Sequence, residues 1–398
     1  MKITVIGAGA IGSAITRDLC SRDDVEQVQV CDARARALQH LHETADNKKL
    51  RSFQVDVRDQ NVLEPILAGS DCVIGAATPE LNTSIAETCV SIGAHFCGLG
   101  GNDDLVRKQL DLNDRAAARG VWVIPNCGLA PGLVNILCMH GVEQFDHVEI
   151  AKLRVGDVPL RPEPPFNFRI SWAAEKVIDD YTHPVVLIRD GKIVEKEPLT
   201  GLETIRFREP FQAMEAFRTA GGLSTLAADL EGKIDRLDHK SIRWPGHAAQ
   251  MAFLLGLGLG DDRSVDVLTH LTFRDILARQ LRKRLGGKYA DAVLLRVLIR
   301  GTVGGEKKTL VYEMTDLYDD ELEMTAMRRC VSIATTAIAV MVASGDVDGG
   351  GAAPPERIIP RQDFIDAVID RGLDIKSKWF DGHIGLNQLP EAPAASTA

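Results

Sequence analysis

The chain has 398 residues, of which 45% are hydrophobic and 26% charged, so it is long enough for two domains with sizeable cores. Its formal net charge of −10 at pH 7 argues against nucleic acid or an anionic membrane as a main partner. The eight cysteines show neither a C-x-x-C pair nor a zinc-type spacing, and several lie inside apolar runs. We therefore expect no metal site and reduced core thiols in a cytoplasmic protein.

The first predicted element is a strand, KITVIG, which leaves no room before it for a signal peptide. The glycine-rich turn GAGAIG follows, and then a helix with apolar residues at four-residue spacing. A strand that enters a helix through such a turn is typical of a dinucleotide-binding unit, in which the helix N-terminus holds the pyrophosphate. The expected pyrophosphate-binding residues are Gly7, Gly9, Ala10, Ile11 and Gly12.

A carboxylate at the end of the second predicted strand indicates which dinucleotide binds. The strand VQVCD ends in Asp32, twenty residues after Gly12. A carboxylate there accepts hydrogen bonds from the adenosine ribose and repels a 2′-phosphate, which favours NAD over NADP. Arg34 and Arg36 follow closely, and either is suited to receive a phosphate. The residues therefore favour NAD and leave NADP open.

Strands and helices continue to alternate to about residue 130. Further strands are expected at 52–57, 71–78, 94–100 and 121–128, with helices at 61–69, 81–93 and 103–120. This rhythm predicts a Rossmann-type doubly wound parallel sheet, in which ligands bind beyond the carboxyl ends of the strands. By position we expect Asp56 and Val57 on the adenine side, Ala76, Ala77 and Thr78 in the middle, and Gly100 and Cys127 nearer the nicotinamide.

After residue 130 the pattern predicts a second α/β domain, residues 131–325, with an open mixed sheet that serves substrate binding and dimerisation. Its strands are expected at 147–158, 184–199, 203–209, 292–303 and 307–317, with RDGK as a hairpin turn, and its clearest helix at 272–286. Residues 326–385 should form helices that return to the first domain. Within them the apolar run VSIATTAIAVMVASG is too short to span a bilayer and predicts a buried helix. Residues 386–398 read as a disordered tail.

Three polar residues of the second domain are candidates for catalysis: Tyr181, Arg243 and His247. His247 opens a predicted helix after Pro245-Gly246, where the helix dipole keeps an imidazole neutral, as a general base must be. Arg243 is suited to bind a carboxylate with two hydrogen bonds. A tyrosine that caps a sheet edge and a solvated histidine at a helix start are the structural alternatives. Cys127 has no neighbour in sequence that would activate its thiol.

Several segments, taken in order, resemble the saccharopine dehydrogenase-like superfamily, and within it the lysine 6-dehydrogenases. They are VIGAGAIG, PNCGLAPGLVNIL, VPLRPEPP, DDYTHPVVLIRDGK, EAFRTAGGLSTL, IRWPGH and PPE. The resemblance implies NAD-dependent oxidation of the ε-amine of L-lysine, release of ammonia and closure of the semialdehyde to a cyclic imine. It also implies a role in lysine degradation and a homodimer or higher homo-oligomer. Tyr181, Arg243 and His247 fall on its motif positions. Proton transfer by His247 and carboxylate binding by Arg243 are hypotheses from their chemistry.

Two other functions stay open at this stage. After the fourth strand the chain reads GAATPELN, where members of the family carry an aromatic residue, so the amine donor can differ from lysine. A saccharopine or opine-type dehydrogenase, which acts on a secondary amine formed from an amino acid and a 2-oxo acid, needs cations for a second carboxylate. Arg154, Arg161, Arg169 and Arg218 are available for that purpose. A non-catalytic NAD-binding protein is the third possibility.

Overall fold

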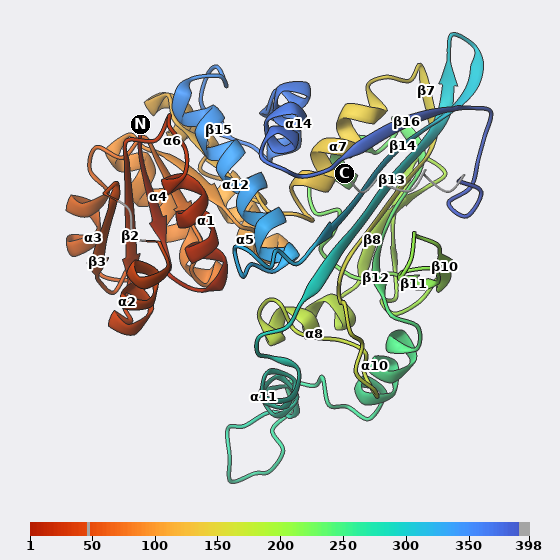
Figure 1. Cartoon of the computed structure of the whole chain (residues 1–398), viewed down its shortest axis with the longest axis horizontal. Helices are drawn as coiled ribbons and strands as arrows, with labels where there is room; N and C mark the ends of the chain where they lie inside the picture. The colour runs from red at the N-terminus through yellow and green to blue at the C-terminus, as the bar shows by residue number, and fades with distance from the viewer. Residues whose placement is uncertain (46–47, 390–398) are drawn as a thin grey trace. The chain divides into compact units, whose positions relative to one another are not determined.

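The computed structural model describes residues 1–45 and 48–389, and the chain divides into two compact units (Figure 1). Unit 1 holds residues 1–139 and 328–373, and unit 2 holds residues 140–327 and the segment from 374 onward. The division therefore falls nine residues after the boundary expected at 130, and the last strand belongs to unit 2 instead of returning to unit 1.

Unit 1 is built on a seven-stranded sheet in the order β15-β6-β5-β4-β1-β2-β3, and all its strands are parallel. The predicted doubly wound sheet is confirmed, because the strand order reverses between β1 and β4 as the chain crosses over. Its strands are β1 (Lys2–Ile6), β2 (Gln27–Asp32), β3 (Leu50–Gln54), β4 (Cys72–Gly75), β5 (His95–Gly98), β6 (Trp122–Ile124) and β15 (Gly351–Ala352).

Helices pack against this sheet and close its core. They are α1 (Ala10–Cys20), α2 (Ala35–Thr44), α3 (Gln60–Leu67), α4 (Asn82–Ile92), α5 (Asp103–Leu110), α6 (Asn113–Arg119), α13 (Pro355–Ile358) and α14 (Arg361–Asp370), with a 3-10 turn η1 (Pro79–Leu81). Two helices cross the unit division along the chain, α7 (Leu133–Val142) and α12 (Ala326–Ser344). Residues of α3, α4 and α6 share one apolar core with the strands.

The long apolar helix α12 is buried, as its sequence predicts. Among the described residues it is the one helix that is long and apolar enough to cross a membrane by length and composition, and 78% of that stretch is buried within the structure. The Thr336 hydroxyl of α12 donates a hydrogen bond to Asp18 of α1. This late helix is thereby bonded to the first helix of unit 1. All eight cysteines are buried.

Unit 2 contains a mixed nine-stranded sheet whose main path is β10-β11-β12-β7-β13-β14-β16, with β8 paired to β12 and β9 to β8. The strands are β7 (His147–Pro159), β8 (Val185–Arg189), β9 (Lys192–Lys196), β10 (Glu203–Ile205), β11 (Met214–Phe217), β12 (Ile234–Arg243), β13 (Asp291–Val303), β14 (Glu306–Leu317) and β16 (Lys376–Asp381). Only β12 and β7 pair in parallel, and the long strands β7, β13 and β14 lie side by side (Figure 1). Asp190 and Gly191 both have positive φ, 50° and 74°, as the predicted two-residue hairpin turn requires.

The two faces of this sheet have different covers. Helices α8 (Ala174–Thr182), α10 (His247–Gly256) and α11 (Phe273–Leu285) form one core with Phe217 of β11, and a short helix α9 (Leu226–Leu230) precedes β12. On the opposite face, residues 205–214 and Leu386 close a second core. Residues 386–389 were expected in a disordered tail, but Leu386 is buried and Asn387 donates to the Thr204 carbonyl. The rest of that predicted tail, 390–398, lies outside the described residues.

Candidate active site

The three glycines after β1 serve different purposes in the structure. A Cβ on Gly12 would lie 1.9 Å from the Gly7 carbonyl oxygen, and a Cβ on Gly7, whose φ is +107°, would lie 2.7 Å from the Ala76 carbonyl oxygen. Both are therefore required by the protein's own packing. A Cβ on Gly9 would meet only Nη2 of Arg34, at 4.0 Å. Because nothing in the protein needs a bare backbone at Gly9, the space beside it fits a ligand that approaches the turn closely.

The N-terminus of α1 is open to an anion. No side chain caps its first turn and no acidic residue lies there, so the early amides of Ala10 and Ile11 are not screened by a carboxylate. A diphosphate placed against the bare backbone of Gly9 would meet these donors. The residues present therefore fit the pyrophosphate of a dinucleotide.

Asp32 lies at the end of β2, beside the glycine-rich turn, and is 8% exposed. Its Oδ2 accepts from the Ala8 amide at 2.8 Å, and both carboxylate oxygens accept from the Arg34 side chain at 3.0 Å. Burial alone would raise the pKa of Asp32, but the hydrogen bonds from Arg34 and Ala8 outweigh it and hold the pKa below its usual value. Arg34 itself remains 66% exposed, so a cation stands where the adenosine ribose is expected.

The remaining cofactor residues expected from sequence occupy loops at the carboxyl ends of the strands. Ala76, Ala77 and Thr78 follow β4, and Gly100 follows β5 with φ +106°. Asp56 and Val57 follow β3. The exposed Asp56 is ion-paired with Arg58, whose hydrogen bonds lower the pKa of that carboxyl to about 2.

Cys127 follows β6, but its thiol does not face an open space. The side chain is fully buried and Sγ lies 3.2 Å from the Ile124 carbonyl, as a donor. The backbone of Cys127 is also engaged, since its amide donates to Gly98 and its carbonyl accepts from Thr335. The Cys127 thiol is therefore not placed to contact a cofactor, and only the location of the residue at the carboxyl end of β6 supports a role there.

In unit 2 the structure brings Tyr181, Arg243 and His247 together from α8, β12 and α10, and we call these three the polar cluster. The Tyr181 hydroxyl lies 3.0 Å from His247 Nε2, and Arg243 Nε donates to the same hydroxyl at 3.3 Å. The direction of the Tyr181–His247 hydrogen bond depends on the tautomer of His247; we assign the tautomer with the ring proton on Nδ1, in which the Tyr181 hydroxyl donates to Nε2. All three side chains are almost fully buried.

Aromatic rings enclose the polar cluster. Phe168 lies 4.6 Å from His247 between ring centroids, and the Arg243 guanidinium lies 5.0 Å from the same Phe168 ring and 5.6 Å from the Trp172 ring. Phe217 stacks on His247 with the ring centroids 6.2 Å apart. Phe168 and Trp172 belong to the segment 160–173 between β7 and α8, which also contains Pro162, Pro164 and Pro165.

The enclosure sets the charge state of each member. Burial, and then the positive charge of Arg243, lower the pKa of His247 to about 3, so this imidazole is neutral at every physiological pH. The dipole of α10, which the sequence suggested as the cause, also lowers the pKa of His247, but burial and Arg243 are enough to keep the imidazole neutral. Burial raises the pKa of Tyr181, which keeps its proton. Burial alone would lower the pKa of Arg243, but Tyr181 and Asp157 outweigh it.

Two carboxylates that sequence reasoning missed fix the geometry. Asp157 Oδ1 lies 3.5 Å from Nη1 of Arg243, and Ser171 donates to the other carboxylate oxygen of Asp157. Glu215 accepts from the Gly246 amide at 2.8 Å and the Ala248 amide at 2.7 Å, so it caps the first turn of α10. The available signal was an acidic residue inside each apolar strand, RVGDVP and MEAF.

Tyr181 lies in the last turn of α8 and not at a sheet edge, and His247 is the first residue of α10, as expected. Among the described residues, no group of three or more His, Cys, Asp and Glu side chains is placed to hold a metal ion.

A parallel sheet with an open dinucleotide cradle, joined to a second domain with an enclosed polar cluster, defines a nicotinamide-dinucleotide-dependent oxidoreductase of two domains. Comparison with known families agrees. Residues 3–124 match the saccharopine dehydrogenase NADP binding domain, and residues 128–373 match the saccharopine dehydrogenase C-terminal domain. The chain belongs to the saccharopine dehydrogenase family, as its sequence motifs indicate.

Curated relatives are distant. The chain is 20% identical over 279 residues to the saccharopine dehydrogenase [NADP(+), L-glutamate-forming] of Saccharomyces cerevisiae, a match that spans 67% of this chain and 60% of the yeast protein. It is 21% identical over 249 residues to the alpha-aminoadipic semialdehyde synthase of Arabidopsis thaliana, which spans 59% of this chain and 23% of the plant protein. The chain thus spans less than two thirds of these relatives.

Two solved structures share the fold over nearly the whole chain. An apo saccharopine dehydrogenase (L-Glu forming) from Saccharomyces cerevisiae superposes with a TM-score of 0.78 at 15% identity, covering 95% of this chain and 99% of that one. A homospermidine synthase from Legionella pneumophila in complex with NAD superposes with a TM-score of 0.70 at 14% identity, covering 99% and 95%.

Proposed function

We propose that this protein is an amino-acid dehydrogenase that oxidises the carbon bearing the ε-amine of L-lysine, or of a related amine, and releases ammonia from the resulting imine. The observation that carries the proposal is the neutral Tyr181–His247 pair, which is held by Arg243 inside an aromatic enclosure. A bound nicotinamide dinucleotide would supply the hydride acceptor. The protein must bind the amine in its neutral form and place water against the imine.

The polar cluster has one unused acceptor position suited to an amine. Tyr181 accepts one hydrogen bond from Arg243 and donates its own proton to His247, so one lone pair on its hydroxyl oxygen remains for a substrate N–H. His247 Nε2 accepts a hydrogen bond from the Tyr181 hydroxyl and so fixes the direction of the remaining lone pair, which is suited to accept from the neutral amine or from the attacking water. The aromatic enclosure keeps bulk water from this contact.

Arg243 is better suited to orient Tyr181 than to bind a substrate carboxylate. Its guanidinium lies between two rings, pairs with Asp157 and donates to the Ile242 carbonyl at 2.8 Å. A carboxylate would have to displace Asp157 to reach it. We therefore assign Arg243 the role of fixing the Tyr181 hydroxyl, in place of the carboxylate-binding role expected from its chemistry.

A saccharopine-type reaction is the second candidate, and the relatives' names favour it. That reaction needs further cations for the extra carboxylates of its substrate. Of the four arginines considered from sequence, Arg154 and Arg218 project from the opposite face of the unit 2 sheet, where Arg154 pairs with Glu203 and Asp238. Arg169 pairs with Glu163. Of these four arginines this leaves Arg161 for a second carboxylate, which favours the smaller substrate.

The assay that separates these functions is simple. With L-lysine and NAD alone, the proposed enzyme should form NADH and ammonia in equal amounts. A requirement for 2-oxoglutarate and reduced coenzyme, with L-lysine consumed, would establish the saccharopine-type reaction instead. Dinucleotide binding without turnover of any amine or secondary amine would indicate a non-catalytic protein.

Variants connect the activity to the polar cluster. Tyr181→Phe should lower kcat at least a hundredfold with little change in dinucleotide affinity, because it removes the hydroxyl that holds the amine. His239→Gln is the matched control, since His239 is another buried histidine of unit 2 and its two ring nitrogens have no hydrogen-bond partner among the described residues. Equal activity of Tyr181→Phe and the wild type would exclude this mechanism.

We propose NAD as the coenzyme, because Asp32 stands where a 2′-phosphate would otherwise lie. The pairing of Asp32 with the exposed Arg34 makes the preference dependent on one side chain. The matching family model is described as NADP binding, which makes a comparison of both coenzymes the first kinetic measurement to perform.

A further inference from the structure

The polar cluster does not bind the other end of an amino-acid substrate. Tyr181 is suited to contact the amine that is oxidised, and Arg243 is engaged by Tyr181 and Asp157, so neither is available for an α-carboxylate. An amino acid also carries an α-ammonium group, on the same carbon as its carboxylate. A site for this head group therefore needs a cation and an anion next to each other, close to Tyr181.

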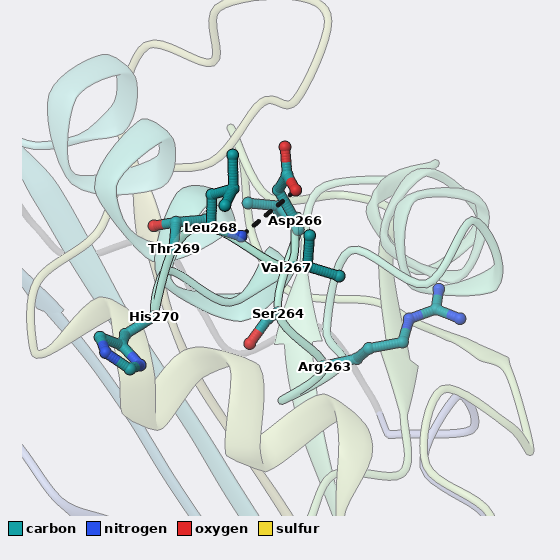
Figure 2. Close-up of a pocket in the computed structure, with 8 residues that line it drawn as sticks. Arg263, Ser264, Asp266, Val267, Leu268, Thr269 and His270 are labelled. Atoms are coloured by element: carbon teal, nitrogen blue, oxygen red, sulfur yellow. Dashed lines mark hydrogen bonds between the residues drawn. The ribbon is translucent and has the colours of Figure 1, made fainter.

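The loop at residues 263–270 does not supply these two charges. Its residues line a hollow, and Figure 2 shows the side chains of Arg263 and Asp266 projecting from it in different directions. Val267 and Leu268 of the same loop are 97% and 92% exposed. Charges that are separated and fully solvated hold a zwitterion weakly, so the head group must be sought elsewhere in unit 2.

Helix α8 provides a suitable ion pair. Lys176 Nζ lies 3.1 Å from Asp180 Oδ1, and Asp180 directly precedes Tyr181 in the chain. The Lys176 side chain is 34% exposed and the Asp180 side chain is 19% exposed. A ligand can therefore reach both charges from solvent, while the partial burial makes their electrostatic interactions stronger than those of a fully solvated pair.

A glycine of the motif AGGLST lies beside this ion pair. The Ala220 amide donates to the Asp180 carbonyl at 2.9 Å, which holds the segment against the last turn of α8. Gly221 has φ +83°, and a Cβ on it would lie 3.2 Å from Lys176 Nζ and 3.8 Å from Asp180 Oδ1. The bare backbone at Gly221 thus leaves space next to both charges that a side chain would fill.

The charge of Asp180 is only partly balanced by its neighbours. Burial raises the pKa of Asp180, although the positive charges of Lys176 and then Arg243 oppose it. A further cation beside this carboxylate would stabilise its ionised form. Burial is also the main cause of the raised pKa of Tyr181, and the charge of Asp180 adds to it. Asp180 is therefore close enough to act electrostatically on the polar cluster.

We propose that Lys176 and Asp180 bind the head group of an α-amino acid, Lys176 its carboxylate and Asp180 its ammonium group, while Tyr181 contacts the amine at the other end. This inference rests on the proposed function for the reaction at Tyr181. The consecutive positions of Asp180 and Tyr181 fit two amines on one short aliphatic chain, as in L-lysine. A diamine would use Asp180 alone, so Lys176 is the residue that selects an amino acid over a diamine.

Two analogues of L-lysine test the two charges separately. Cadaverine lacks the carboxylate and ε-aminocaproate lacks the α-ammonium group, and each keeps the amine to be oxidised. Lys176→Met should lower kcat/KM at least about tenfold for L-lysine and ε-aminocaproate, and by less than about threefold for cadaverine. Asp180→Asn should lower kcat/KM at least about tenfold for L-lysine and cadaverine, with ε-aminocaproate little changed.

This crossed pattern distinguishes recognition from a structural role. An ion pair that only stabilises α8 would affect the three compounds alike. Lys176→Arg, which keeps the charge, should restore most of the activity on L-lysine. Glu175→Gln is the matched control, because Glu175 is the neighbouring residue of α8 and forms an exposed ion pair with Arg282. It should leave kcat/KM for all three compounds unchanged.

Calorimetric titration of the protein saturated with NADH makes the same comparison without turnover. Lys176→Met should bind L-lysine and ε-aminocaproate about tenfold or more weakly than the wild type, and cadaverine equally well. This binding pattern without oxidation of any amine would keep the head-group site and remove the proposed reaction. Equal losses for the three compounds would overturn the head-group site and leave the reaction standing. A wild type that binds none of them would also overturn it.

Discussion

At the scale of single residues, Arg34 connects structure to coenzyme choice. Its guanidinium occupies both oxygens of Asp32 and lies close to Gly9, so it covers the expected ribose site with a positive charge. With NAD, the ribose hydroxyls must compete with Arg34 for the carboxylate. With NADP, the same arginine can turn to the 2′-phosphate. One side chain therefore opposes the preference that Asp32 creates.

Arg34→Ala should sharpen the preference for NAD. A charge-assisted hydrogen bond is worth about 1.5–3 kcal/mol, so the ratio of kcat/KM for NAD to that for NADP should rise about tenfold or more. Steady-state kinetics with both coenzymes measure this ratio. Arg36→Ala measures the contribution of the other exposed arginine of this segment, which is also suited to receive a phosphate. An unchanged ratio in Arg34→Ala would show that Arg34 does not reach the 2′-position.

The same scale shows where sequence reasoning stops. Asp32 could be predicted because its distance along the chain from Gly12 is set by one strand–helix–strand unit. Asp157 and Glu215 could not, since each acts on a residue about 30 to 90 positions away through strand pairing that no local pattern reveals. Arg243 stays a candidate from sequence, and its buried partner Asp157 argues for a different role from the one that its chemistry alone suggests.

At the scale of elements, the β1–α1 junction is the part of the fold that the sequence defines best. A buried strand, three glycines and a periodic helix are local features, and the structure confirms each of them. Elements that depend on partners were harder to predict. β10 has three residues and β15 has two, and both exist because a neighbouring strand offers backbone hydrogen bonds. β16 is mostly exposed and polar, so no alternation marked it.

Two glycine variants distinguish packing from ligand binding in this junction. Gly12→Ala places a Cβ 1.9 Å from the Gly7 carbonyl oxygen and should destabilise unit 1 by about 3 kcal/mol or more. Gly9→Ala meets no protein atom closer than 4.0 Å, so it should leave the thermal midpoint almost unchanged. It should nevertheless weaken dinucleotide binding about tenfold or more, because its methyl group occupies the place of the pyrophosphate.

Thermal unfolding and calorimetric titration with NAD measure the two effects on the same samples. Gly93→Ala measures the stability lost when alanine takes a positive φ without any clash, since Gly93 has φ +78° and no atom lies within 4 Å of the added Cβ. If Gly9→Ala bound NAD as tightly as the wild type, the cofactor cradle would have to lie elsewhere.

At the scale of the whole molecule, each unit is assembled from two separated stretches of chain. The change to a helical pattern near residue 325 predicted that the C-terminal helices return to unit 1. It did not predict that the chain would cross back to add β16 to the edge of unit 2, because a strand at an edge needs little hydrophobic content. Both units therefore depend on the last fifth of the chain.

Buried histidines should make the stability of unit 2 fall on mild acidification. Burial, then the charge of Arg154, lower the pKa of His239 to about 4, and the pKa of His247 is about 3. In the unfolded chain a histidine titrates near pH 6.5. Above that pH both states are neutral and neither residue affects stability. Below it the unfolded state binds protons that the folded state cannot, so the free energy of unfolding decreases as the pH falls.

His239→Gln should remove one of the sites at which the unfolded state binds a proton and the folded state does not. Both ring nitrogens of His239 lack a hydrogen-bond partner, so the substitution breaks no bond. Between pH 6 and 4.5 the free energy of unfolding of the variant should fall less steeply than that of the wild type, by up to about 1.4 kcal/mol per pH unit. Urea unfolding at a series of pH values, followed by a probe in unit 2, measures the slope. His40→Gln, at an exposed position of α2, should follow the wild type. Parallel slopes for wild type and His239→Gln would mean that His239 is protonated in the folded protein, because only a charged imidazole there would leave the proton balance unchanged.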